Sequence, residues 1–372
     1  MPRPLTVVQL LPALESGGVE RSTLEIAEAL LRAGHRAIVV SNGGRLLPQL
    51  QAMGAEHVAL DIGRKSPFTC RHVPALRKLF REVDADIVHA RSRLPAWLAW
   101  FALRGMRERR PHFVTTAHGL NSPSRYSAIM ARGERVVCVS DTVREYLLRH
   151  YPAIDPRRLA LIPRGIDPAA FPPAPLPDPQ ARAQVAALHP QLDADGPLLL
   201  LPGRGTRLKG HADAIALLAN LRASDLDARL WMPGARQDGR EAYAAELDAM
   251  ARAAGVEDAI AISEATADIA TAYAASDLVL QLSRKPEAFG RTVIEALAVG
   301  RPVLGWAHGG VGELLRELQP QGAVPPFDAT ALASTARSLL AQAAMPAVTM
   351  QRYRLQAMQE STLALYQTLV EA

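Results

Sequence analysis

Two glutamates stand among apolar residues in the stretch that begins at Arg284, RKPEAFGRTVIEALAVGRPVLGWAHGGVGEL. Glu287 follows Pro286, and Glu295 comes eight positions later inside the run TVIEALAVG. A carboxylate within an apolar helix is costly unless hydrogen-bond donors satisfy it. Vicinal hydroxyls are such donors, and a ribose offers two. The two carboxylates are therefore candidates for binding a sugar or a nucleoside.

The spacing of the two glutamates favours a loop followed by a helix. One continuous helix would place them about 12 Å apart along its axis and about 80° apart around it, which fits a single ligand poorly. Pro286 and Gly290 favour a loop before Thr292. Glu287 is then expected on the loop, and Glu295 in the first turns of the helix.

Neighbouring residues add a second interpretation and a further candidate site. Each glutamate can instead pair with a nearby arginine, such as Arg291 or Arg301, in a surface salt bridge. Downstream, Gly309, Gly310 and Gly312 stand at the expected start of another helix. Backbone N–H groups at a helix N-terminus favour anions.

A basic loop, PGRGTRLKGH, follows an apolar run that starts at Pro197. Arg204 and Lys209 bracket this loop and place two cations where a diphosphate can bind, Arg as a planar fork and Lys as a compact charge. The segment does not match the P-loop pattern. A flexible charged loop without a ligand is the other interpretation.

Two loops of the N-terminal half also follow apolar runs. In ESGGVER, Gly17 and Gly18 allow backbone amides to approach a phosphate at a helix N-terminus, although a plain tight turn explains them too. The dinucleotide fingerprint G-x-G-x-x-G is absent there. In TTAHGLNSPSRY, His118 is a catalytic candidate, with a purely structural histidine as the alternative.

The elements that must position these residues form a repeating pattern. Apolar, β-branched runs alternate with amphipathic helical runs such as VERSTLEIAEALLRAG, which ends at Gly34 as a helix cap would. This alternation predicts a parallel, doubly wound α/β sheet. We expect strands within 5–11, 37–41, 86–90, 112–118, 135–140 and 159–163, and then within 197–205, 228–234, 259–263, 277–283 and 301–306.

A proline-dense connection, PPAPLPDP at 172–179, separates the two series of strands. The sequence thus predicts two Rossmann-like domains, at 1–175 and 190–345. A last helix, at 346–372, is long enough to reach back to the first domain. In such sheets ligands bind beyond the carboxyl ends of the strands, which is where the candidate loops lie.

Composition excludes several classes of protein. A chain of 372 residues with 49% hydrophobic and 21% charged residues is globular rather than disordered. Its two cysteines build no disulfide scaffold, no Cys/His cluster has zinc-ligand spacing, and a cytoplasmic location is expected. The apolar N-terminal run is interrupted by Gln9 and Pro12, so we interpret it as a strand rather than a signal peptide. No apolar run reaches about 18 residues, the length that spans a membrane.

The net charge of +5 is unevenly distributed. Residues 1–165 carry 25 Lys and Arg against 14 Asp and Glu, a difference of +11, and the remainder carries 17 against 23, a difference of −6. The basic half is either a solvated surface or attracted to an anionic membrane face or a phosphorylated acceptor. Nucleic acid is not expected, because no binding motif accompanies the charge.

A helical stretch from Val88 to Arg110, VHARSRLPAWLAWFALRGMRERR, belongs to this basic half. Trp97 and Trp100 are followed by a basic tail. One interpretation is a core helix with a basic end, and the other is contact with a membrane surface or an anionic lipid-linked glycan.

Taken together, these motifs resemble the retaining family-4 glycosyltransferases of the GT-B fold over almost the whole chain. PEAFGRTVIEALAVGRPV is similar to the Glu-x7-Glu signature of that family, GRGTRLKG to its basic loop, and GGVER and TTAHG to its two first-domain loops. The resemblance implies two Rossmann-like domains facing a cleft. It also implies transfer of a hexose-type sugar, with retention, from a UDP- or GDP-linked donor.

The resemblance implies a role for each matching residue. Arg204 and Lys209 would bind the donor diphosphate, Glu295 the ribose hydroxyls and Glu287 the transferred sugar. The Gly17–Gly18 loop would lie against the phosphate and sugar, with His118 close to the reacting centre. Phe289 and Gly290 would support backbone contacts with the sugar. The family generally uses no catalytic metal and no cofactor, because fixed cations stabilise the leaving diphosphate.

Related bacterial enzymes often carry GRLTRWKG, where this chain has Gly205 and Leu208, which leaves the donor's identity open. HARSRLPAW and the segment from His118 are similar to bacterial enzymes that build lipopolysaccharide core or related surface glycans. A glycan or glycolipid acceptor at the inner face of the cytoplasmic membrane is therefore expected. Two alternatives are a sugar-nucleotide epimerase of the same fold and a glycan-binding scaffold without activity.

Overall fold

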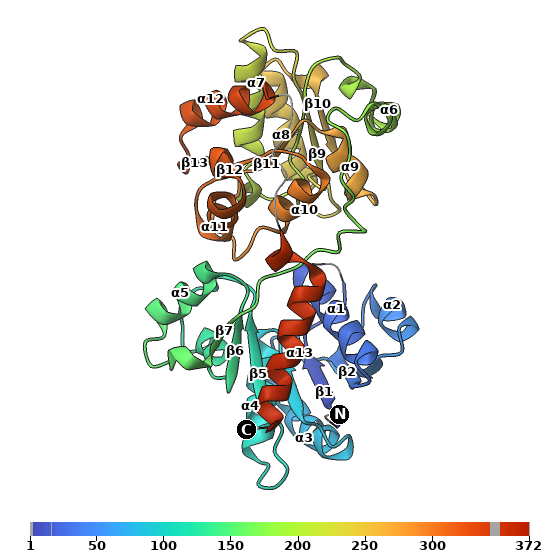
Figure 1. The fold of residues 1–372 in the computed structure, drawn as a ribbon, viewed down its shortest axis with the longest axis vertical. Coiled ribbons are helices and arrows are strands. Elements are labelled where there is room, and N and C mark those ends of the chain that lie inside the picture. Colours follow the sequence, from blue (N-terminus) through green and yellow to red (C-terminus); the bar gives the residue numbers. More distant parts are fainter. Residues whose placement is uncertain (1–2, 16, 343–349, 372) are drawn as a thin grey trace. The chain divides into compact units, whose positions relative to one another are not determined.

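The computed structural model describes residues 3–15, 17–342 and 350–371, and the chain divides into two compact units. The first unit is Met1–Gly165 with Leu355–Ala372, and the second is Ile166–Arg354. Each unit is a fully parallel β-sheet with helices between the strands (Figure 1). The predicted doubly wound α/β fold is confirmed, with one Rossmann-like sheet per unit.

The first unit contains a seven-stranded sheet in the order β3-β2-β1-β4-β5-β6-β7. Its strands are β1 (Thr6–Leu10), β2 (Arg36–Ser41), β3 (Glu56–Ala59), β4 (Ile87–Ala90), β5 (His112–Ala117), β6 (Arg135–Cys138) and β7 (Leu159–Leu161). Its helices are α1 (Gly18–Arg32), α2 (Leu47–Ala52), α3 (His72–Glu82), α4 (Arg93–Arg104), α5 (Asp141–His150) and α13 (Leu355–Glu371). The strand order reverses between β1 and β4.

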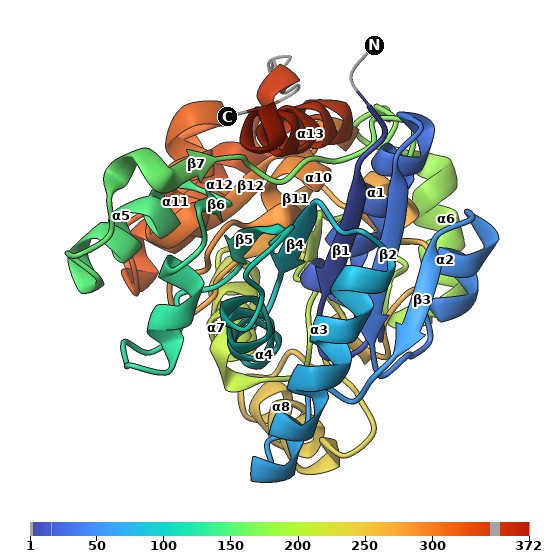
Figure 2. The same cartoon turned by 90° about the horizontal axis from the view of Figure 1, so that it is seen from below.

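Two apolar layers cover the faces of this sheet because successive strand residues point to opposite sides. Val7 packs in the layer with α1 and α13, and Val8 in the layer with α3 and α4. Figure 2 shows α13 on one face of the sheet and α3 and α4 on the other. Helix α1 ends at Arg32, and Gly34 adopts φ 75° just beyond it, in the predicted capping position.

Polar contacts attach the last helix to the first unit. The Arg32 guanidinium donates to the Gln359 side-chain oxygen at 2.5 Å, and the Gln359 amide donates to the carbonyl of Glu25 at 2.7 Å. Inside the layer, the Tyr366 hydroxyl lies 2.6 Å from His89 Nδ1. We expected a helix over 346–372; α13 begins at Leu355, and residues 343–349 lie outside the described residues.

The second unit contains a six-stranded sheet in the order β10-β9-β8-β11-β12-β13. Its strands are β8 (Leu198–Leu200), β9 (Arg229–Pro233), β10 (Ile260–Ser263), β11 (Leu278–Gln281), β12 (Val303–Trp306) and β13 (Ala323–Val324). Its helices are α6 (Pro179–Leu188), α7 (His211–Arg222), α8 (Glu241–Ala253), α9 (Ile269–Ala275), α10 (Arg291–Val299), α11 (Gly309–Leu318) and α12 (Ala329–Leu340). The order reverses between β8 and β11.

Arg301 explains why the first domain ends earlier than the expected residue 175. Its fully buried guanidinium donates to the carbonyls of Ala174, Pro175 and Ala274, so residues 166–175 belong to the second unit. The amide of Ala174 also donates to the carbonyl of Val299 at 3.1 Å. Arg301 therefore forms no surface salt bridge with either glutamate, and that interpretation is wrong for this arginine.

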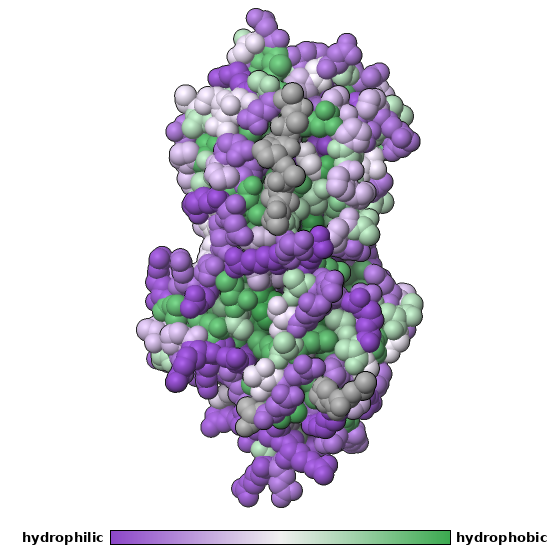
Figure 3. Space-filling model, viewed as in Figure 1, coloured by the Kyte–Doolittle hydropathy of each residue, from purple (hydrophilic) through white to green (hydrophobic). Residues whose placement is uncertain are grey.

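The face drawn in Figure 3 is mostly polar, with apolar side chains scattered among the polar ones. Among the described residues, no helix is both long and apolar enough to cross a bilayer. The two cysteines are free thiols, Cys70 exposed and Cys138 buried. Burial raises the pKa of Cys138 to about 12.

Candidate functional site

The strongest candidate site lies in the second unit, where its strand order reverses. Two loops start at the carboxyl ends of the adjacent strands β8 and β11, residues 201–210 and 282–290, and we call them the β8 and β11 loops. Ligands of doubly wound sheets bind at this position, because the helices on either side of the reversal turn to opposite faces and leave space. The basic loop and the first glutamate of the sequence analysis occupy these two loops.

Two glycines allow the backbone of the β8 loop to approach the neighbouring backbone closely. Gly210 adopts φ 78°, and a Cβ there would lie 2.0 Å from the carbonyl oxygen of Leu282 on the β11 loop. A Cβ on Gly205 would lie 2.1 Å from the carbonyl oxygen of Ala235. Larger residues at 205 would displace the loop, whereas Leu208 is about half exposed. Gly205 and Leu208, the two positions at which this loop differs from the related enzymes, thus alter the packing of the loop as well as the pocket wall beside it.

Lys209 and Glu287 meet although 78 residues separate them in sequence. Lys209 Nζ donates to Glu287 Oε1 at 2.6 Å, and both side chains are about a quarter exposed. The hydroxyl of Ser283 donates to the same carboxylate oxygen. The carbonyl of Glu287 accepts from the amide of Gly310, which attaches the β11 loop to the start of α11. The ammonium of Lys209 and the hydrogen-bond-accepting carboxylate of Glu287 therefore lie together at a partly solvated position.

Arg204 is exposed at the other side of the β8 loop. Among the described residues, its guanidinium has no hydrogen bond or ion pair, unlike that of Arg207, which pairs with Glu246. Lys285 of the β11 loop is also exposed. Arg204 is thus available to an anion without breaking an internal contact, whereas Lys209 would have to be shared with or released from Glu287.

Glu295 lies in α10 and is 7% exposed. The hydroxyl of Tyr273, on α9, donates to its Oε2 at 2.9 Å. Sequence reasoning missed Tyr273, because a tyrosine in an apolar helix is an ordinary core residue and no local signal connects it to a carboxylate in another helix. A buried carboxylate in this helix therefore has a protein donor before any ligand arrives.

The loop expected between the two glutamates is present. Phe289 is buried with its ring 6.1 Å from that of Tyr353, and Gly290, at φ 122°, caps the start of α10. Two of the three glycine amides that we considered for an anion are engaged within the protein. The amide of Gly310 donates to Glu287, and that of Gly312 donates to the carbonyl of His308. The N-terminus of α11 therefore supports the β11 loop, and the amides of Gly310 and Gly312 are not available to an anion.

In the first unit, the GG loop and His118 take the expected positions after strands. Gly17 caps the N-terminus of α1, where no side chain supplies a capping hydrogen bond. His118 follows β5, and its Nδ1 accepts from the Arg164 guanidinium. His118 Nε2 is shielded from solvent and has no hydrogen-bond partner among the described residues.

Burial and the nearby guanidinium groups of Arg164 and Arg91 hold the pKa of His118 well below 6.5. The ring is therefore neutral near pH 7. Because Nδ1 is an acceptor, the single ring proton is on Nε2. His118 is thus arranged to donate a hydrogen bond from Nε2 rather than to remove a proton.

Comparisons with known proteins agree with this architecture. Residues 16–170 match the family model described as Glycosyltransferase Family 4, and residues 188–355 match Glycosyl transferases group 1. A D-inositol 3-phosphate glycosyltransferase from Xylanimonas cellulosilytica is 30% identical over 248 residues, 61% of this chain and 56% of that protein. The chain spans about half the length, or less, of the curated relatives that it matches.

Solved structures are similar over the full chain. A glycosyltransferase from Rickettsia africae is 28% identical with a TM-score of 0.86, and the match covers 100% of both chains. HepE from Anabaena, solved with UDP-glucose, is 19% identical with a TM-score of 0.78 over 97% of this chain and 99% of that one. WaaG, a glycosyltransferase involved in lipopolysaccharide biosynthesis, is 19% identical with a TM-score of 0.66, covering 98% and 97%.

Proposed function

Because this chain belongs to the GT-B glycosyltransferases, with a family 4 domain followed by a group 1 domain, we propose that it transfers a hexose from a UDP- or GDP-linked donor to a glycan or glycolipid. The observation that carries the proposal is the Lys209–Glu287 pair at the strand-order reversal of the second unit. It combines a cation for a diphosphate with an acceptor for sugar hydroxyls, as transfer from a nucleotide sugar requires.

In this proposal Arg204 and Lys209 neutralise the negative charge that develops on the diphosphate as it leaves. Such electrostatic stabilisation by preorganised groups is usually the largest single contribution to catalysis. Glu287 binds the transferred sugar, and Glu295 binds the ribose. Phe289 and Gly290 shape the backbone beside the sugar. In the first unit, the Gly17–Gly18 loop approaches the donor, and neutral His118 donates from Nε2 to the sugar. The bond between the sugar and the diphosphate breaks, the sugar passes to a hydroxyl of the acceptor with its anomeric configuration retained, and the hydroxyl proton goes to the leaving diphosphate, without a metal.

A binding and transfer panel tests this function. We expect one nucleotide diphosphate, UDP or GDP, to raise the melting temperature, because a ligand that binds only the folded state stabilises it. The matching nucleotide sugar should support transfer that persists in EDTA, and NMR of the product should show retention. Isomerised donor without an acceptor would indicate the epimerase instead. Absence of binding to any nucleotide sugar would indicate the scaffold.

The acceptor is proposed to be part of the lipopolysaccharide core or another surface glycan, met at the cytoplasmic face of the inner membrane. Support comes from α4, whose one face packs in the core while Phe101 on the other is 45% exposed. The guanidinium of Arg104 stacks 4.6 Å from the Trp100 ring, and that of Arg132 lies 5.0 Å from it. Aromatic rings with arginines suit an anionic membrane surface.

Vesicle binding tests this membrane contact. The protein should sediment with phosphatidylglycerol vesicles and less with phosphatidylcholine, and raising the salt should weaken binding because the attraction is screened. Phe101→Ser should reduce binding several-fold. Phe68→Ser is the matched control, since Phe68 is 79% exposed elsewhere on the same unit and should change little. The membrane contact would be refuted if vesicle binding did not depend on salt concentration, or if the two variants lost vesicle binding equally.

A further inference from the structure

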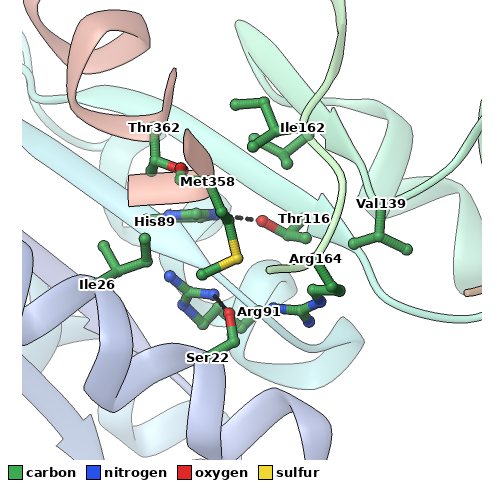
Figure 4. A pocket seen from close by; sticks show the side chains of 11 residues that line it. Ser22, Ile26, His89, Arg91, Thr116, Val139, Ile162, Arg164, Met358 and Thr362 are labelled. Carbon is green, nitrogen blue, oxygen red and sulfur yellow. Dashed lines mark hydrogen bonds between the residues drawn. The ribbon is translucent and has the colours of Figure 1, made fainter. Parts of the chain in front are cut away.

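The first unit contains a hollow that the proposed donor chemistry does not use. It lies between α1, the carboxyl ends of β4 to β7 and α13 (Figure 4), and its volume is about 20 Å³, room for one oxygen-sized group of a ligand at a site that is otherwise open to solvent. Its polar lining consists of Ser22, His89, Arg91, Thr116, Arg164 and Thr362. We call it the Arg91 hollow.

Arg91 is 4% exposed, yet one nitrogen of its guanidinium has no hydrogen-bond partner in the described part of the chain. Nε donates to the side-chain oxygen of Gln9 at 2.7 Å, and Nη1 donates to the hydroxyl of Ser22 at 3.0 Å. Nη2 is buried and has no hydrogen-bond partner among the described residues. Both of these partners are neutral, and among the described residues no carboxylate forms an ion pair with Arg91, although Glu25 attracts its charge without a direct contact. A buried charge without a counter-ion is costly.

The hollow as a whole is cationic. Two of its lining residues are arginines, Arg91 and Arg164, and none is acidic. The histidines beside them do not change this, because burial holds the pKa values of His89 and His118 well below 6.5 and leaves both neutral. Figure 4 shows the side chains of Arg91 and Arg164 on the same side of the hollow as Ser22. An oxyanion would supply the missing charge and the missing acceptor together.

Arg91 also stands where a ligand is expected. It follows β4 directly, and its amide donates to the carbonyl of Leu10 at the end of β1. The strand order of the first sheet reverses between these two strands. Doubly wound sheets bind ligands at such reversals. The unpartnered Nη2 is therefore at the position of this unit that corresponds to the donor loops of the second unit.

We infer that Arg91 binds an oxyanion of the acceptor, a phosphate or a carboxylate, in the Arg91 hollow. The anion accepts a hydrogen bond from Nη2 and offsets the buried charge, with Arg164 beside it. Assigning this anion to the acceptor rests on the proposed function, in which the second unit takes the donor. Arg164 also contacts His118, so an anchored acceptor would lie close to the hydrogen-bond donor of the same unit.

Thermal shift of the full chain tests the site directly. Inorganic phosphate and sodium glucuronate are compared with sodium chloride at equal ionic strength, each in the presence of saturating nucleotide diphosphate. At about tenfold the dissociation constant, phosphate or glucuronate should raise the melting temperature by about 2 °C. Lys209→Ala, which removes a cation of the donor site, should keep this rise. Arg91→Gln should lose it, whereas Arg64→Gln, which removes an exposed arginine of the same unit, should keep it.

A second variant covers the case in which Arg91→Gln does not fold. Ser22→Asp places a carboxylate beside Arg91, so it should melt higher than the wild type without ligand and no longer respond to either anion. The inference is overturned if neither anion stabilises the wild type, if Arg91→Gln or Ser22→Asp keeps the response, or if Lys209→Ala abolishes it. An anion response without transfer from any donor would leave the site standing and remove the proposed function. Sugar transfer without a response to either anion would support the proposed function and overturn the anion site at Arg91.

Discussion

Replacing Lys209 by alanine should lower the turnover number at least 100-fold while the protein stays folded. Removing one preorganised group that stabilises transition-state charge typically costs a factor of about 100 to 1,000. The ammonium of Lys209 is held in place by Glu287 at 2.6 Å and is a quarter exposed, so it is positioned before the diphosphate arrives. Nucleotide affinity should fall as well. Steady-state transfer and calorimetry with the nucleotide measure the two effects.

Lys285→Ala is the matched control for Lys209→Ala. It removes the same charge from the neighbouring β11 loop, where the side chain is exposed, and should change turnover less than twofold. His118→Gln is a useful comparison, because it should retain nucleotide affinity and lose turnover. If Lys209→Ala keeps more than a third of the wild-type turnover, the diphosphate role of Lys209 is wrong.

Replacing Glu295 should raise the KM for the donor. Comparing two substitutions at this position distinguishes the effect on donor binding from the effect on the free energy of unfolding. Glu295→Gln should raise KM about 10- to 100-fold, since hydrogen bonds to a charged group contribute about 1.5–3 kcal/mol. Its amide oxygen can still accept from Tyr273, so the free energy of unfolding should change little. Glu295→Ala should raise KM similarly and also cost about 1–3 kcal/mol of stability, because a buried hydroxyl loses an acceptor.

Tyr273→Phe is the control for this pair, because it removes the hydroxyl and keeps the carboxylate. It should lower the free energy of unfolding by about 1 kcal/mol and change the donor KM much less than Glu295→Gln. Denaturant unfolding and donor saturation curves supply the two readouts. Equal donor KM values for Glu295→Gln and the wild type would show that Glu295 is only a structural residue bonded to Tyr273.

Local sequence signals were sufficient for most of the fold. The strands expected at 5–11 and 277–283 are present as β1 and β11, because apolar, β-branched runs between turn residues indicate buried strands directly. Strands β3 and β13 were missed. Strand β3, EHVA, lies at a sheet edge and is largely accessible, and β13 has only two residues, so neither has a distinctive apolar run.

The limits of the units depended on contacts distant in sequence. We expected the proline-dense segment at 172–179 to connect the two domains, but Arg301 binds the carbonyls of Ala174 and Pro175, so this segment belongs to the second unit and the first unit ends at Gly165. In the same way, Gln359 and Tyr366 show how α13 packs on the first unit, which its amphipathic pattern alone does not specify.

For the site, the order of residues along the chain was enough to show which loops follow strands and which chemical groups they contain: Arg204 and Lys209 on one, Glu287 on another, and His118 on a third. Periodicity and the turn residues glycine and proline are local properties, so they can be read along the chain. Tertiary structure decided which of these groups meet. The Lys209–Glu287 pair exists because β8 and β11 are neighbours and Gly210 lets their loops touch. Likewise, only the packing of α1 and α13 shows that Nη2 of Arg91 is buried without a hydrogen-bond partner among the residues that the structure describes.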